Sequence, residues 1–210
     1  MEKSPKENLF STALYLGIFT IIYNLLEGTI SVFFGFEDES LALFGFGIDS
    51  YIEMISGIGI THMIYRIKKN NEVEQDKFEI TALKITGYSF YFFTFGIVST
   101  GIINLIEQNV PISSFWGVVI SIISILVMVL LFNKKLKVGK ELLSEPIIAD
   151  ANCTKICIYM SIILLASSGI YELTHFKYVD SIGAFGLAYF SLKEGKECFE
   201  KAKGKIIFKC

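Results

Sequence analysis

Three long stretches without a charged residue constrain this chain more than any other feature. They cover residues 9–26, 85–106 and 112–133. Each comes close to the roughly 20 apolar residues that a helix needs to cross about 30 Å of membrane hydrocarbon. Weaker apolar segments at residues 42–65, 146–171 and 179–197 contain ionisable or thiol side chains, and we interpret them as helices too. The sequence therefore predicts an all-α integral membrane protein with six transmembrane helices in a lipid bilayer.

The charged residues gather between these helices. The second connection, the fourth connection and the tail are basic, whereas the odd-numbered connections, as in "FEDES" and "EQNVP", are acidic or nearly neutral. The fourth connection contributes Lys134, Lys135, Lys137 and Lys140. Basic residues mark the cytosolic side, so both termini are predicted to face the cytosol from a plasma or inner membrane.

Several classes of function find no support in the residues. The net charge is -2, and no basic patch suited to nucleic acid is present in the sequence. The sequence also lacks a glycine-rich phosphate loop, a hydrolase nucleophile motif and a zinc-enzyme signature. We therefore expect neither an enzyme nor a bound cofactor.

Two acids interrupt the apolar segment at residues 42–65. Asp49 and Glu53 are four residues apart, so they share one face of a helix. Carboxylates inside a membrane are costly, face the interior of a bundle and mark paths for ions or protons. Cys153 and Cys157 have the same spacing within the segment at residues 146–171. The two pairs are the strongest indication of function in the chain.

The two segments also repeat one pattern. In "SLALFGFGIDSYIE" and in "SEPIIADANCTKIC" a serine, Ser40 or Ser144, precedes the first member of the pair by nine residues. The predicted orientation brings these helices in from opposite sides, which indicates two inverted three-helix halves, as in many secondary transporters. Nine residues at 1.5 Å each reach about 13 Å inward, near the membrane centre. We therefore predict that both pairs lie at one depth.

Two carboxylates and two thiolates can surround one cation with the tetrahedral geometry that zinc accepts. Adding two sulfurs to oxygen ligands shifts the preference toward zinc, cadmium, mercury or copper(I). Because thiols bind metals as thiolates, protons compete with the ion for the same groups. Asp49, Glu53, Cys153 and Cys157 are thus the predicted metal ligands, and exchange of metal for protons is the predicted chemistry.

At these residues the chain resembles the cation diffusion facilitators, a family of cation efflux proteins. The segment "ISVFFGFEDESLALFGFGIDSYIEM" is similar to the family's first-to-second helix region, and "SEPIIADANCTKIC" to its approach to the fifth helix. A third segment, "YVDSIGAFGLAYFSLKEGKECFEKA", is similar to its sixth helix. The resemblance spans most of residues 10–202.

The resemblance implies a six-helix efflux protein, usually a homodimer, that exchanges a divalent transition-metal ion for protons. The family's ligand positions map onto the two i, i+4 pairs, and polar positions of its first helix onto Asn24 and Glu27. The cysteine pair departs from the family's His or Asp and points to softer ions. The family's cytosolic metal-binding domain has no counterpart, since only "KGKIIFKC" follows Ala202. We expect a membrane domain at residues 1–202 and a short basic cytosolic tail at residues 203–210.

Other polar residues keep two interpretations each. Asp150 would support the metal site or pair with Lys155, and Asn24 and Glu27 would line the ion pathway or join helices by hydrogen bonds. Asp180 would line the pathway or simply stabilise the first turn of its own helix.

Two further cysteines and two other functions complete the predictions. Cys198 and Cys210, near or in the tail, are interpreted as incidental residues. One alternative function is a thiol-redox or sensory protein in which Cys153 and Cys157 cycle between dithiol and disulfide. The other is a non-transporting subunit that works only with a partner.

Overall fold

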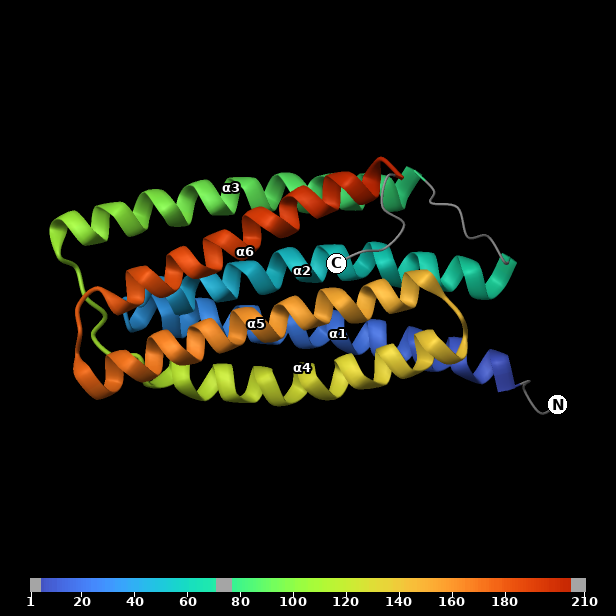
Figure 1. Cartoon of the computed structure of the whole chain (residues 1–210), viewed down its shortest axis with the longest axis horizontal. Coiled ribbons are helices and arrows are strands. Elements are labelled where there is room, and N and C mark those ends of the chain that lie inside the picture. The colour runs from blue at the N-terminus through green and yellow to red at the C-terminus, as the bar shows by residue number, and fades with distance from the viewer. Residues whose placement is uncertain (1–4, 71–76, 205–210) are drawn as a thin grey trace.

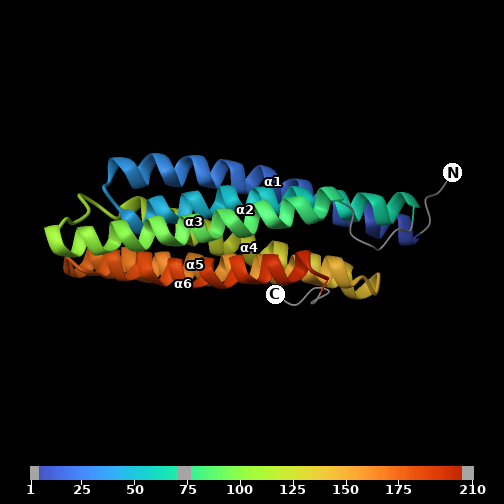
Figure 2. The ribbon, with the colours of Figure 1, turned by 90° about the horizontal axis from the view of Figure 1, so that it is seen from above.

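The computed structural model of the chain describes residues 5–70 and 77–204, and these residues form six α-helices and no strand. The helices are α1 (Pro5–Glu37), α2 (Leu41–Asn70), α3 (Lys77–Glu107), α4 (Phe115–Glu141), α5 (Glu145–Thr174) and α6 (Val179–Ala202). They run back and forth along one long axis (Figures 1 and 2). The all-α prediction is confirmed, and all six predicted segments are helices. Most of the basic tail expected at residues 203–210 lies outside the described residues.

Hydropathy separates one helix from the other five. Helices α1 to α5 are long and apolar enough to cross a membrane. Helix α6 has 24 residues, which also suffices in length, but its second half carries several Lys and Glu residues that lower its hydropathy. It packs along α3 and also contacts α5 and α2. The bundle thus gives the charged part of α6 protein neighbours.

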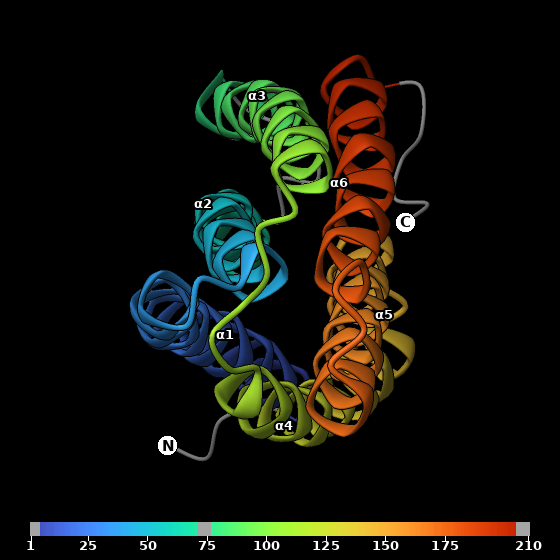
Figure 3. The ribbon, with the colours of Figure 1, turned by 90° about the vertical axis from the view of Figure 1, so that its left-hand side faces the viewer.

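The helices form two facing rows when the bundle is viewed from one end (Figure 3). Helices α1, α2 and α3 make one row, and α4, α5 and α6 make the other. Across the rows α1 contacts α4, α2 contacts α5, and α3 contacts α6. Because α2 begins at the end of the bundle opposite to the start of α5 (Figure 1), the two three-helix halves have inverted directions.

Close approach of α1 and α2 depends on two glycines. A Cβ added at Gly47 would lie 2.7 Å from the backbone nitrogen of Val32, and one at Gly35 would overlap the backbone of Phe44. Small residues at such crossings let helices in a membrane pack backbone to backbone. The two glycines therefore fix how α2 lies beside α1.

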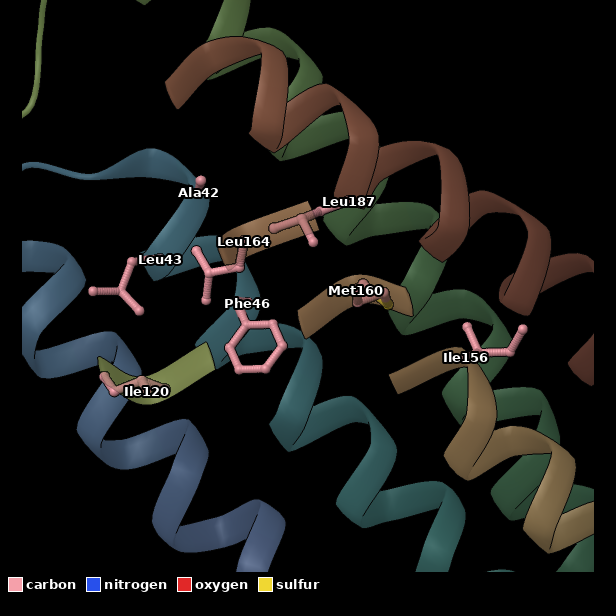
Figure 4. Packing of buried hydrophobic residues seen from close by; sticks show 8 residues of the cluster. All are labelled: Ala42, Leu43, Phe46, Ile120, Ile156, Met160, Leu164 and Leu187. Atoms are coloured by element: carbon pink, nitrogen blue, oxygen red, sulfur yellow. The ribbon is translucent and has the colours of Figure 1, made fainter. Parts of the chain in front are cut away.

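A core of apolar side chains joins the two rows in the part of the bundle where α2, α4 and α6 begin (Figure 4). Phe46 of α2 lies in this cluster together with Ile120 of α4, Met160 of α5 and Leu187 of α6. The outer surface is apolar as well, and Phe92, for example, is 80% exposed. An apolar exterior around a packed core is what a lipid-embedded bundle requires.

Candidate metal centre

The acid pair of α2 and the cysteine pair of α5 contact each other through one residue of each pair. The Cys157 thiol of α5 donates a hydrogen bond to Oε1 of Glu53 on α2, with 2.8 Å between sulfur and oxygen. The sulfur is a free thiol and is buried. The contact joins residues 104 positions apart in the sequence, one from each inverted half. A carboxyl group and a thiol from the two halves are therefore hydrogen-bonded inside the bundle.

Asp49 lies one turn from Glu53 but faces another helix. Its side chain is 2% exposed, and its Oδ1 accepts a hydrogen bond of 2.9 Å from the hydroxyl of Ser191 on α6. Asp49 is thus engaged with α6 rather than with Cys157.

Cys153 lies one turn from Cys157 and is half-buried, and its sulfur belongs to a disulfide rather than to a free thiol. The Nζ atom of Lys201 on α6 is 3.4 Å from its sulfur. The Cys157 sulfur is also 3.5 Å from the backbone carbonyl oxygen of Cys153. The fifth-helix pair therefore faces the same interior as Glu53, as the spacing predicts.

A small cavity of about 40 Å³ connects these groups. Its lining includes Glu53, Cys153 and Cys157 but not Asp49. From the centre it extends along α2, α5 and α6 toward the end of the bundle that carries the basic segments. A cavity needs roughly 10–15 Å³ of such space to hold a water, so this one is large enough to be hydrated.

Asn24 and Glu27 of α1 take different places beside this centre. The Asn24 side-chain amide lies 3.4 Å from Oε2 of Glu53, to which it donates, whereas Glu27 accepts hydrogen bonds from Tyr23 and Ser50. Both residues are buried. Asn24 lines the cavity, and Glu27 joins α1 to α2 by a hydrogen bond.

Asp150 pairs with a different lysine from the expected one. Lys135 of α4, which is 1% exposed, lies 3.0 Å from the Asp150 carboxylate and 3.1 Å from the hydroxyl of Thr154. Lys155 is exposed, with its Nζ 5.8 Å from the centre of the Tyr159 ring. Five residues along a helix turn Lys155 to another face from Asp150. The alternative that paired Asp150 with Lys155 is therefore wrong. All four lysines assigned to the fourth connection lie in the last turns of α4 instead.

Asp180 holds the start of another helix. It lies in the first turn of α6, yet it accepts hydrogen bonds from the Ser40 hydroxyl at 2.6 Å and from the Leu41 backbone nitrogen at 2.8 Å. Those groups lie at the N-terminus of α2, whose free N–H groups need acceptors. Asp180 thus links the two halves at the end opposite the basic segments.

Helix α6 supplies polar groups that the sequence analysis either left out or, in the case of Cys198, interpreted as incidental. Its buried residues include Ser191, Glu194, Cys198 and Lys201, which are three, four and three positions apart. That spacing places all four on one stripe of a helix, so the pattern was present in the sequence. The last three line the cavity.

The donor atoms point to a two-residue arrangement rather than to a finished cage. Among the described residues, no three His, Cys, Asp or Glu side chains stand together as a group able to hold a metal ion. Glu53 and Cys157 form one oxygen–sulfur pair, and Asp49 and Cys153 each lie one turn away from it. Such a pair can bind a proton between its atoms or offer both atoms to a cation.

Comparison with known proteins places this arrangement in a family. No curated protein matches the chain. The family model described as the cation efflux transmembrane domain matches residues 14–204, which is most of the chain. The inverted halves and the acid–thiol contact between α2 and α5 lie within that match. The protein is therefore a member of the cation efflux family, and cation transport across a membrane is its general function.

Proposed function

We propose that the protein exports a zinc-like or softer divalent metal cation, such as zinc or cadmium, in exchange for protons. The ion binds Asp49, Glu53, Cys153 and Cys157 near the middle of the membrane. One observation carries the proposal: a carboxylate and a thiol from opposite halves meet at 2.8 Å beside an interior cavity. Intramembrane acids with such partners typically mark ion and proton paths.

The donor atoms support both the ion class and the coupling. An oxygen–sulfur set favours zinc and softer ions over magnesium or calcium. The thiol proton that Cys157 donates to Glu53 would have to leave when the ion binds, because sulfur binds metals only as thiolate. Metal entry therefore releases protons, and proton return releases the metal.

Asp49 and Cys153 each lie one helix turn from the Glu53–Cys157 pair, so their side chains must move to complete the site. We expect Asp49 to exchange its hydrogen bond with Ser191 for the ion. Cys153 would join the site only after its disulfide is reduced, because sulfur binds metals as thiolate. Since α2 and α5 belong to opposite halves, rocking of one half against the other opens the site alternately to each side. We also propose that the protein is a homodimer with both termini in the cytosol, on the basis of the family resemblance and the basic segments.

The test is metal flux into proteoliposomes that contain the purified protein and carry an imposed pH gradient. We expect zinc or cadmium uptake that follows the gradient, and loss of uptake in Asp49→Ala and in the Cys153→Ser, Cys157→Ser double variant. Uptake that is unchanged in both variants would rule out the four-residue site.

Flux, together with a thiol count on the same vesicles, separates the two other functions. A thiol-redox protein would show no flux but would change its thiol count with the applied redox potential. A non-transporting subunit would show neither property when it is reconstituted alone.

A further inference from the structure

Helix α6 carries a carboxylate and a thiol at the same i, i+4 spacing as the acid pair of α2 and the cysteine pair of α5. Glu194 and Cys198 are four residues apart and therefore lie on one face of the helix. Their residues are 7% and 3% exposed, and Cys198 is a free thiol. Both line the cavity that contains Glu53 and Cys157. The pair offers the same donor atoms, oxygen and sulfur, as the central contact.

One oxygen of the Glu194 carboxylate lacks the hydrogen bond that a buried acid normally makes. This oxygen, Oε1, is buried and makes no hydrogen bond to any described residue. Buried polar groups are almost always hydrogen-bonded, and an orphaned one in a binding cavity calls for a ligand, an ion or water. Of the two lysines that line the cavity, Lys135 pairs with Asp150, whereas Lys201 acts electrostatically on Glu194 without a hydrogen bond to its Oε1 atom. The cavity therefore presents an unpaired acceptor to whatever enters it.

Packing alone accounts for only part of this arrangement. Cys198 also contacts an apolar cluster that contains Ile52 and Phe90, so a small apolar side chain would fill that side equally well. Packing gives no reason for a buried acid one turn away, because an unpaired carboxylate destabilises the fold. A role in binding a cation explains both residues together.

The pair lies between the centre and the basic end of the bundle. Ser191 of α6 contacts Asp49, and α6 runs in the same direction as α2 (Figure 1). At 1.5 Å per residue, Cys198 lies about 10 Å beyond Ser191, whereas Glu53 lies about 6 Å beyond Asp49. Cys198 is thus about 4 to 5 Å farther along the route toward the basic end than Glu53.

We propose that Glu194 and Cys198 form a loading subsite for a zinc-like or cadmium-like divalent cation, with water as its remaining ligands. This subsite deepens the proposed export function and rests on it. An ion pathway conducts when each binding site binds tightly enough to admit the ion and weakly enough to release it, and several weak sites in series achieve this. A two-ligand site at Glu194 and Cys198, placed before the four-ligand central site, has that property.

The experiment isolates the subsite from the central site. In the full chain with Cys153, Cys157 and Cys210 replaced by serine, Cys198 is the last thiol, and cadmium is added in detergent. We expect a saturable ultraviolet band from one cadmium–thiolate bond. Glu194→Gln in this background should weaken the binding about 10- to 100-fold, the range for loss of a supporting metal-site group. Glu200→Gln, on the same helix, is the matched control and should leave the titration unchanged.

Two outcomes overturn the proposal: no cadmium–thiolate band in a chain that elutes as one folded species, or a band whose titration ignores Glu194→Gln. A second measurement covers variants that fold poorly. In the otherwise unaltered chain, Glu194→Gln and Cys198→Ser should raise the KM for cadmium flux more than they lower kcat, and an unchanged KM in both contradicts the subsite. If the original chain transports nothing while the single-thiol chain still binds cadmium, the export function fails and the binding subsite stands.

Discussion

Glu53 receives a hydrogen bond from each half of the molecule. Asn24 of α1 donates to one carboxylate oxygen and Cys157 of α5 donates to the other. The two oxygens of this one side chain therefore hold both a polar amide and a thiol in place. It is the residue at which replacing a carboxyl group without loss of volume is most informative.

At the residue scale, we expect Glu53→Gln to reduce metal flux by at least about 10- to 100-fold, because a metal ligand contributes no less than the groups that support it. Glutamine preserves the size and can still accept from Cys157, so the protein should fold. Flux in proteoliposomes measures the effect, and the exposed Glu141→Gln on α4 serves as the control. Normal flux in Glu53→Gln would remove this carboxylate from the ion pathway.

Cys157→Ser tests the choice of ion. Serine can still donate a hydrogen bond to Glu53, but it replaces a soft ligand with a hard one. We expect the ratio of cadmium to zinc flux to fall about tenfold relative to the original protein. Competition between the two ions in one vesicle population gives the ratio directly, and an unchanged ratio would show that the sulfur does not contact the ion.

At the scale of elements, Asp180 acts on a helix other than its own. We expect Asp180→Ala to lower the free energy of unfolding by about 1–3 kcal/mol, since it removes both a helix cap and charge-assisted hydrogen bonds to Ser40 and Leu41. Asp180→Asn, which keeps one acceptor, should lose less. Thermal unfolding in detergent compares the two variants, and equal losses would contradict a capping role.

Helices α4 and α5 are joined by the buried pair of Lys135 and Asp150. Removing one partner leaves a buried charge unpaired, so Lys135→Met should destabilise the protein by about 3–5 kcal/mol. The double variant Lys135→Met, Asp150→Asn should recover most of that loss. A double-mutant cycle of unfolding free energies provides the measurement. Additive losses would mean that the two side chains act independently.

The sequence predicts the elements well and their contacts poorly. Residues 9–26 lie inside α1, and residues 42–65 lie inside α2, but both helices extend further because charged residues continue a helix beyond the apolar span. The i, i+4 rule correctly puts Cys153 and Cys157 on one face. It does not say which helix that face meets, so the partners Ser191 of Asp49 and Lys135 of Asp150 follow only from the rotation of packed helices.

At the scale of the whole molecule, the six helices place the connections at two ends. The basic last turns of α2 and α4 lie at one end of the bundle, and the connection from α3 to α4, which contains Asn109, lies at the other (Figure 1). The halves are inverted, so the helices that carry the two i, i+4 pairs, α2 and α5, start at opposite ends of the bundle. Which end faces the cytosol follows from the positive-inside rule alone.

That orientation can be measured with single cysteines in a cysteine-free chain. We expect Lys137→Cys to react with a membrane-impermeant maleimide only from the cytosolic side, and Asn109→Cys only from the opposite side. Both residues are exposed. Intact cells and inverted vesicles provide the two labelling conditions. The reverse labelling pattern would turn the molecule over and make the proposed loading subsite an exit.

The volume of the central cavity has a consequence for dehydration. A divalent ion such as magnesium travels in water with an octahedral shell of six molecules, and a cavity of about 40 Å³ leaves little room for that shell. An ion that reaches Glu53 therefore exchanges part of its water for side-chain ligands. Magnesium dehydrates reluctantly, so the narrowness of the cavity would disfavour the cell's abundant hard cations before any protein ligand chooses between them.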